Sequence, residues 1–343
     1  MTRHLRLPLL GAMVGGAVAA VSCGDPENML SPAGSAARRI AHLGWFVLLT
    51  FSVVTIVMWG LVFWLAARRR GTLAHHLPWN APEDRRWIVI GGFAIPVLVL
   101  GTIFVVMLKS MAAFPMGDDE MDATAAEVRV IGHQWWWEVQ YPAVRAQDTI
   151  VTANEIHIPA GRPIDIELRS SDVIHSFWVP RLHGKVDLFP GQVVNRIRVE
   201  ADAPGRYYGQ CSEYCGPQHA HMLLLVSADR PADYQAWLDR QRAPAAAPGQ
   251  AFAERGREVF MTGQCALCHS IRGTEAQGKV GPDLTHIGSR AGIASNSLRN
   301  DTASLAAWVT HAQSLKPSAI MPNITAFTGE DLRALVAYLQ GLK

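Results

Sequence analysis

The stretch QCSEYCGPQHAHM, from Gln210 to Met222, places two cysteines four residues apart, a histidine four residues further on and a methionine three beyond it. It follows a run of alternating apolar residues that predicts a β-strand, so the loop would lie at one end of a sheet. Thiolate, imidazole and thioether together favour copper over zinc. A single copper electron-transfer site needs one cysteine, so the second thiol indicates two bridged metals or a disulfide between Cys211 and Cys215.

The residues around this loop predict a β-sheet domain. Between Glu127 and Val226, short alternating runs such as IDIELRSSDVIHSFWVP are separated by proline and glycine. Alternation of period two with β-branched and aromatic residues predicts an antiparallel sandwich or barrel. We assign this domain to residues 118–228. His175, which precedes one of its predicted strands, is the candidate for a second imidazole ligand.

Two long apolar segments precede the sandwich. Ile40 to Ala67 and Trp87 to Leu108 carry no charge, and each is long enough to cross about 30 Å of hydrocarbon as a helix. The loop between them carries five arginines, which favours a cytoplasmic loop and therefore an exported sandwich. We predict a two-helix transmembrane hairpin over residues 38–110, in a bacterial plasma membrane.

The first residues have the layout of a secretory signal. Arg3 and Arg6 precede an apolar run from Leu7 to Val21, and Cys23 follows. We predict a signal peptide over residues 1–22. The segment AVSC also resembles a lipoprotein cleavage site, which would leave a lipidated Cys23, and ordinary cleavage is the alternative.

Beyond the sandwich the composition changes twice. Residues 229–250 predict a short helix, Ala232 to Arg242, followed by a linker rich in alanine and proline. Residues 251–343 show helical spacing at their two ends, with glycine- and proline-rich loops between them. They predict a small all-helical domain.

The segment CALCH, Cys265 to His269, indicates covalent haem attachment, in which both thiols bond the porphyrin and the imidazole binds iron. A redox-active dithiol is the alternative for the two cysteines alone. Met321, in a loop before the last helix, is the candidate sixth ligand, because a thioether opposite imidazole raises the haem potential. His286 or His311 in its place would give a bis-imidazole haem.

These motifs carry two family resemblances. Residues 251–343 resemble class I cytochrome c in CALCH, in the MP that contains Met321, and in GPDL at Gly281 to Leu284. DVIHSFWVP, CSEYCGPQHAHM and GHQWWW resemble the copper domain of cytochrome c oxidase subunit II. The fold class implied is a multidomain membrane protein with two transmembrane α-helices, a cupredoxin-like β-sandwich and an all-α class I cytochrome c domain, as in caa-type haem-copper oxidases.

The resemblance to subunit II implies the ligands of a binuclear copper A centre. Two bridging thiolates, two terminal imidazoles and two weak axial ligands would be Cys211, Cys215, His175, His219, Met222 and the backbone carbonyl of Glu213. The Glu213 side chain would also hold a magnesium ion together with subunit I. Trp135, which follows GHQ, would be the residue where electrons enter from cytochrome c, and a packed core tryptophan is the alternative.

The function implied is that of the electron-accepting subunit of a respiratory cytochrome c oxidase. Electrons would pass from the covalent haem c to copper A and on to subunit I, where oxygen is reduced to water with proton translocation. The partners implied are subunit I and the other oxidase subunits, cytochrome c or another donor, and membrane lipid. The net charge of +2 argues against nucleic acid.

Two other functions fit some of the same features. A nitric oxide reductase subunit could carry the same copper domain, and a membrane-anchored copper-delivery or thiol redox protein could use the cysteine pair. In subunit II a glutamate near the second span serves a proton pathway, and Glu83 is a weak candidate for it.

The charge of the two exported domains differs in sign. Residues 118–228 contain fifteen acidic and nine basic side chains, whereas residues 251–343 contain seven and nine. Opposite electrostatic fields favour docking of a tethered haem domain on the copper domain. The linker favours it as well, because it raises the effective concentration of one domain near the other.

Overall fold

The computed structural model describes residues 27–68, 81–112 and 127–343, without the side chains of residues 81–84. The predicted signal peptide and Cys23 lie outside these residues, and so does the side chain of Glu83. The chain divides into two units, Arg38–Pro115 and the remainder, and each is described by itself.

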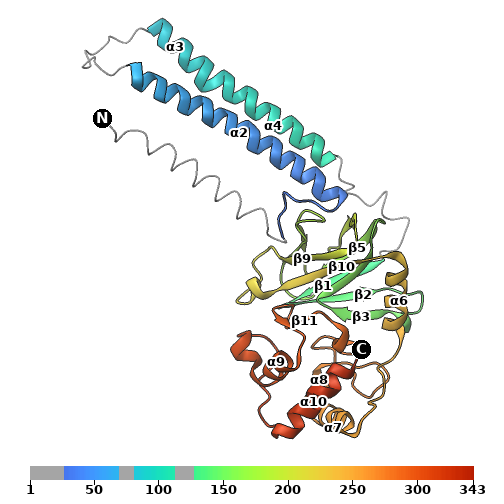
Figure 1. Ribbon diagram of the computed structural model, residues 1–343. Coiled ribbons are helices and arrows are strands. Elements are labelled where there is room, and N and C mark those ends of the chain that lie inside the picture. The colour runs from blue at the N-terminus through green and yellow to red at the C-terminus, as the bar shows by residue number, and fades with distance from the viewer. Residues whose placement is uncertain (1–26, 69–80, 113–126) are drawn as a thin grey trace, which may run out of the picture. The chain divides into compact units, whose positions relative to one another are not determined.

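Two long apolar stretches form the helical unit (Figure 1). α2 runs from Ser35 to Arg68, and α3 (Ala81–Val89) continues through a π-helical turn (Ile90–Ala94) into α4 (Ile95–Ala112). Both stretches are long and apolar enough to cross a membrane. Their large apolar side chains are mostly exposed, as expected for helices that face lipid. The two predicted apolar helices are therefore present.

The π-helical turn lies directly before Pro96. Proline has no N–H to donate to the carbonyl of Gly92, four residues earlier, and its ring crowds that carbonyl. A wider turn accommodates such a residue without ending the helix. The helical stretch accordingly continues across Pro96, as the sequence predicts.

Two five-stranded sheets form the sandwich domain, which we define as residues 127–229 (Figure 1). One sheet has the order β3-β2-β1-β5-β8 and the other β4-β10-β9-β6-β7. The strands are β1 (Val128–His133), β2 (Trp136–Tyr141), β3 (Ile150–Ala153), β4 (Glu155–Pro159), β5 (Ile164–Ser170), β6 (His175–Trp178), β7 (Val186–Leu188), β8 (Asn195–Val199), β9 (Gly205–Cys211) and β10 (Leu223–Asp229).

Strand direction differs from the prediction. β1 pairs with β5 in parallel, and β10 pairs with β4 in parallel, whereas neighbours such as β1 and β2 are antiparallel. Period-two alternation indicates that one face of a strand is buried, but it holds no information on the direction of the neighbouring strand. The predicted sandwich is confirmed, and the purely antiparallel pairing is wrong.

Alternate side chains of both sheets fill the sandwich core. β1 and β2 bury every second residue. The fully buried Trp137 and Phe177, one from each sheet, meet edge to face with 6.2 Å between ring centroids. Burying one such side chain stabilises the fold by about 1.5–3 kcal/mol. This core therefore holds the strand ends, and the loops attached to them, in fixed positions.

The helix α6 (Pro231–Arg242) follows the last strand, within a residue of its predicted start. Proline stands at its first position, where an N–H would have no helical partner. Trp237 on this helix stacks on His157 of β4, with 4.1 Å between ring centroids. The helix thus packs against the sandwich before the linker begins.

The C-terminal domain, residues 251–343, is mainly helical. Its elements are α7 (Ala251–Thr262), α8 (Cys265–Cys268), the short strands β11 (Gly292–Ile293) and β12 (Leu298–Arg299), α9 (Thr302–Leu315) and α10 (Gly329–Gly341). The two terminal helices are predicted, but α9 falls where the sequence suggests only loops. Asp301 caps α9 by accepting a hydrogen bond from Ser304 N at 2.8 Å, a start signal visible in the sequence.

α7 and α10 pack so closely that only glycine fits at one position. A Cβ atom on Gly256 would lie 2.0 Å from the carbonyl oxygen of Ala334 and 2.8 Å from Cβ of Tyr338. The obstacle is largely backbone, which cannot rotate away as a side-chain end can. The missing side chain of Gly256 therefore determines the distance between the two helices.

We predict that Gly256→Ala destabilises the C-terminal domain by about 1–3 kcal/mol, because forced overpacking outweighs the better helix propensity of alanine. Calorimetry of the purified full chain would show its C-terminal transition at a lower temperature. Gly341→Ala is the matched control, since a Cβ there meets nothing within 4 Å. Equal transitions in the two variants would contradict this account of the packing.

Candidate metal and haem sites

Pairing between β6 and β9 brings the first candidate ligands together. Phe177 lies opposite Cys211 in this antiparallel pair, so His175, at the start of β6, lies near the end of β9. The chain then turns through the loop and a 3-10 turn, His219–His221, before β10 begins. One end of one sheet therefore carries the entire predicted ligand set.

The ligand atoms lie in two groups around the two sulfur atoms. The Sγ atoms of Cys211 and Cys215 are 3.8 Å apart, and both cysteines are free. His175 Nδ1 lies 3.9 Å from Cys211 Sγ, and His219 Nδ1 lies 3.6 Å from Cys215 Sγ. Each thiol thus has its own imidazole. The distance of 3.8 Å between the two Sγ atoms is far beyond the roughly 2.05 Å of a disulfide bond.

The two weak donors divide in the same way. The carbonyl oxygen of Glu213 lies 3.2 Å from Cys211 Sγ, and Met222 Sδ lies 3.8 Å from Cys215 Sγ. Met222 is fully buried, whereas the Glu213 side chain is exposed. Two thiolates, two imidazoles, a thioether and a carbonyl suit copper better than zinc, so these residues fit a pair of copper ions.

A carboxylate orients His175. Its Nε2 bonds Asp172 Oδ1 at 2.8 Å, which leaves Nδ1 directed at the sulfur. Burial opposes protonation of His175, but the bonds to Asp172 and Cys211 outweigh it and raise its pKa. Gly132 makes room for the ring, because a Cβ there would lie 2.6 Å from Cδ2 of His175. Such outer partners fix the orientation of a metal ligand.

The two thiols share protons as a pair. The hydrogen bond with Cys215 lowers the pKa of the Cys211 thiol, and the same contact raises the pKa of Cys215. The first thiolate therefore forms easily and the second resists forming, because two negative sulfurs in contact repel each other. A cation between them removes that repulsion.

Trp135 lies against the ligand loop. It is in the turn between β1 and β2 rather than on a strand, and it is buried. Its Nε1 donates to the carbonyl of Cys215 at 2.9 Å, and Gln134 Nε2 donates to the same carbonyl at 2.7 Å. A Cβ on Gly216 would come within 2.9 Å of the Trp135 ring, so glycine permits this approach.

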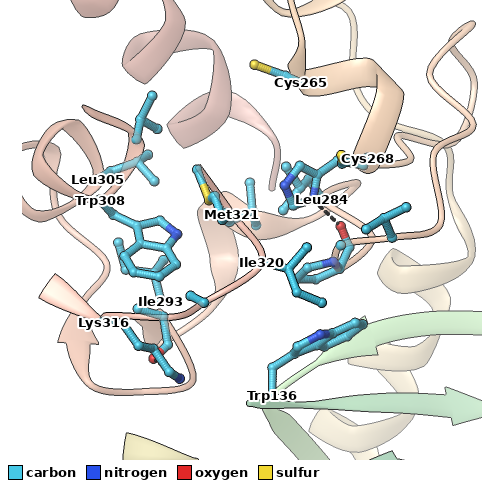
Figure 2. A pocket seen from close by; sticks show the side chains of 18 of the residues that line it. Trp136, Cys265, Cys268, Leu284, Ile293, Leu305, Trp308, Lys316, Ile320 and Met321 are labelled. Carbon is cyan, nitrogen blue, oxygen red and sulfur yellow. Dashed lines mark hydrogen bonds between the residues drawn. The ribbon is translucent and has the colours of Figure 1, made fainter. Parts of the chain in front are cut away.

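The haem candidates surround one cavity of about 330 Å³, which Cys265, Cys268, His269 and Met321 all line. Figure 2 shows Met321 inside the cavity, with Cys265 and Cys268 toward one end and Trp136 toward the other. Apolar side chains form much of the wall, namely Leu284, Ile293, Leu305, Val309, Leu335 and Leu339. A flat apolar macrocycle fits such a wall.

His269 is oriented for iron. Its Nδ1 donates to the carbonyl of Pro282 at 2.8 Å, so Nε2 is the atom left for a metal. Burial lowers the pKa of His269, which favours the neutral ring that iron requires. A Cβ on Gly281 would lie 2.5 Å from Cε1 of His269, so the GPDL loop packs directly on this ring.

The alternative iron ligands lie elsewhere. His286 Nε2 bonds the carbonyl of Ala243, and His311 Nδ1 bonds the hydroxyl of Thr310. Neither residue lines the cavity, whereas Met321 does. The geometry therefore favours the thioether as the sixth ligand.

Four residues near the sites have no role in the sequence-based prediction. Asp172 bonds His175 and Gln134 bonds the carbonyl of Cys215, and Trp136 and Lys316 line the candidate haem cavity. Asp172 lies within the motif DVIH, so its spacing of three from His175 was a usable signal. Nothing in the local sequence marks Lys316, because its neighbours in space are far away along the chain.

Comparisons with known proteins agree on both domains. The family described as cytochrome C oxidase subunit II, periplasmic domain, matches residues 146–229, and the cytochrome c family matches residues 253–343. The crystal structure of the periplasmic domain of subunit II of cytochrome oxidase from Bradyrhizobium japonicum is 26% identical, with a TM-score of 0.32. That match covers 35% of this chain and 96% of that chain.

Two curated relatives align along most of the chain. Cytochrome c oxidase subunit 2 of Bacillus subtilis is 28% identical over 100% of this chain and 99% of its own length. Cytochrome c oxidase subunit 2 of Alkalihalophilus pseudofirmus is 33% identical over 94% of this chain and 93% of its own length. The chain belongs to the cytochrome c oxidase subunit 2 family, in a form that includes a cytochrome c domain.

Proposed function

We propose that this chain receives electrons for a respiratory cytochrome c oxidase and passes them from its own haem c to a copper A centre and on to subunit I. The observation that carries the proposal is the buried pair of thiols, 3.8 Å apart, with an imidazole Nδ1 beside each. This arrangement suits two bridged coppers better than one copper or zinc ion. The names of the relatives support the same reaction.

When bound, the copper pair and the haem supply one-electron oxidation and reduction. In the sandwich domain the thiols of Cys211 and Cys215, the imidazoles of His175 and His219, the Met222 thioether and the Glu213 carbonyl would hold the coppers. Asp172 holds the His175 ring, and the sheet core excludes water. Ligands held this firmly need little rearrangement when charge changes.

In the C-terminal domain Cys265 and Cys268 would hold the haem covalently. His269, oriented by the Pro282 carbonyl, and Met321 would hold the iron. The apolar wall of the cavity would keep water away from the haem. Low water access and the thioether ligand both favour a high haem reduction potential.

Trp135 is proposed as the residue through which electrons reach the copper centre. Its side chain lines the haem cavity and also donates to the carbonyl of Cys215, so it touches both sites. That position supports the role, and the same side chain also packs in the sandwich core.

The complex follows from the same proposal. Subunit I, where oxygen would be reduced to water with proton translocation, other oxidase subunits, an upstream cytochrome c and membrane lipid are the partners. The two helices would anchor the chain in the plasma membrane, with the other domains on the outer side. The exposed Glu213 carboxylate is free to contribute to a magnesium ion at the boundary with subunit I.

The copper proposal is tested at His219. We predict that His219→Ala lowers copper affinity at least about tenfold, because a terminal ligand is lost. Oxygen consumption by the assembled oxidase with reduced cytochrome c would fall in proportion. His221→Ala is the matched control, since the His221 ring bonds Gln218 rather than a ligand. Normal copper content and turnover in His219→Ala would refute the ligand assignment.

The iron ligation is tested at Met321. We predict that Met321→His lowers the haem midpoint potential, because imidazole replaces a thioether. A redox titration followed by haem absorbance measures the shift. Met261→His is the control, since Met261 packs against the domain core without lining the cavity. An unshifted potential in Met321→His would exclude Met321 as a ligand.

The role of Trp135 is tested by Trp135→Phe. Loss of the Nε1 contact with the Cys215 carbonyl is predicted to slow haem-to-copper transfer by about tenfold, which corresponds to a barrier higher by about 1.4 kcal/mol. Flash-induced reduction of the haem, followed optically, measures this rate. Trp237→Phe, on α6, should leave it unchanged. The same rate in both variants would remove Trp135 from the path.

A further inference from the structure

One short segment of the C-terminal domain makes several hydrogen bonds to the sandwich domain. The segment 291–297, which comprises Ala291, β11 and the turn that leads to β12, makes four hydrogen bonds to the sandwich. These are Ala291 N to Glu155 Oε2 at 3.0 Å, Ser295 Oγ to Leu223 O at 2.9 Å, Asn296 Nδ2 to Asn154 O at 2.5 Å, and Ser297 Oγ to His221 O at 3.1 Å. All four acceptors lie on β4 or β10, or at most two residues before one of these strands.

The turn has an unusual backbone. Ala294, Ser295 and Asn296 have φ angles of 52°, 60° and 58°, a left-handed region that side chains disfavour. Three such residues in succession persist only where their surroundings compel the conformation. The two-residue strands β11 and β12 offer little support of their own, so the contacts with the sandwich are what favour this shape.

Lys316 reaches into the same contact from the end of α9. Lys316 is only 4% exposed. Its Nζ donates to Trp135 O at 2.7 Å, to His221 O at 2.8 Å and to Ala294 O at 3.3 Å. Two of these carbonyls belong to the sandwich domain and the third to the left-handed turn. One ammonium group therefore joins the two domains and the turn.

Lysine chemistry suits this position. An ammonium group has three donors and no acceptor, and here it meets three carbonyl oxygens. Burial lowers the pKa of Lys316 to about 7, because the charged form loses its water. The carbonyls offset part of that loss only while the domains are in contact. A lysine on an exposed surface would gain nothing from such an arrangement.

We propose that Lys316 is a positioning residue that fastens the C-terminal domain to the sandwich domain, with the haem cavity facing Trp135 and Trp136. Both tryptophans and Lys316 line that cavity, and Figure 2 shows Trp136 and Lys316 away from Cys265. Opposite net charges attract the two domains to each other, whereas Lys316 determines their relative orientation. The expected effect on electron transfer rests on the proposed function, whereas the contact between the domains does not.

The experiment compares Lys316→Met with Lys343→Met in the full chain, loaded with haem and copper. Lys343→Met removes the same charge from the same domain at an exposed residue. Amide hydrogen exchange over residues 291–297 reports the contact without any need for metal. Flash reduction of the haem reports the transfer rate to copper. If the domains are in contact for only a fraction of the time, the observed transfer rate falls in proportion to that fraction.

We expect Lys316→Met to speed exchange at the turn, and to slow haem-to-copper transfer, each by on the order of tenfold, while Lys343→Met changes neither. Unchanged exchange overturns the proposal, with or without slower transfer. Faster exchange with an unchanged rate overturns the positioning role. If the wild-type chain shows no internal transfer, the proposed function fails instead, and exchange still decides on Lys316.

A measurement on the wild-type chain tests the same contact in case the Lys316→Met variant does not fold. Acylation of lysine amines, followed by mass spectrometry, compares Lys316 with Lys343. A fastened Lys316 should react at least about tenfold more slowly, because its Nζ is buried and fully engaged. Equal rates would overturn the proposal.

Discussion

The pairing of β6 with β9 is the constraint on which the metal site depends. Because Phe177 lies opposite Cys211, His175 enters the sheet beside the last residue of β9, and the loop to β10 then returns Met222 to the same place. Trp137 and Phe177 pack beneath this end of the sheet. The ligands therefore converge before any metal binds, and a bound ion needs to organise little more than the second thiolate.

The same sheet end also serves the contact with the C-terminal domain. His221 lies beside the proposed ligand Met222, and the His221 carbonyl accepts from Lys316 and Ser297. Trp135 donates to the carbonyl of Cys215 while its own carbonyl accepts from Lys316. The groups that shape the loop from Gln210 to Met222 therefore also contact the C-terminal domain, so a shift at either would change the other.

Much of this organisation could be predicted from sequence, because each feature has a local cause. Uncharged runs indicate the two helices, alternation indicates the sandwich, and the spacing in CALCH and in the cysteine loop indicates ligands. Strand direction could not be predicted, since alternation reports burial alone, and α9 was missed although Asp301 marks its start. Trp136 and Lys316 could not be assigned either. Trp135, one partner of Lys316, lies 181 residues earlier in the chain, and an isolated lysine in a sequence looks like a surface charge.

The central claim is that the sandwich domain holds two coppers in one shared site. The most direct measurement is the copper and iron content of the full chain, together with its electron spin resonance spectrum. The account predicts two coppers for each iron, with one unpaired electron shared equally between both coppers. One copper per chain with a localised spin, or a Cys211–Cys215 disulfide that excludes copper after reduction, would contradict it.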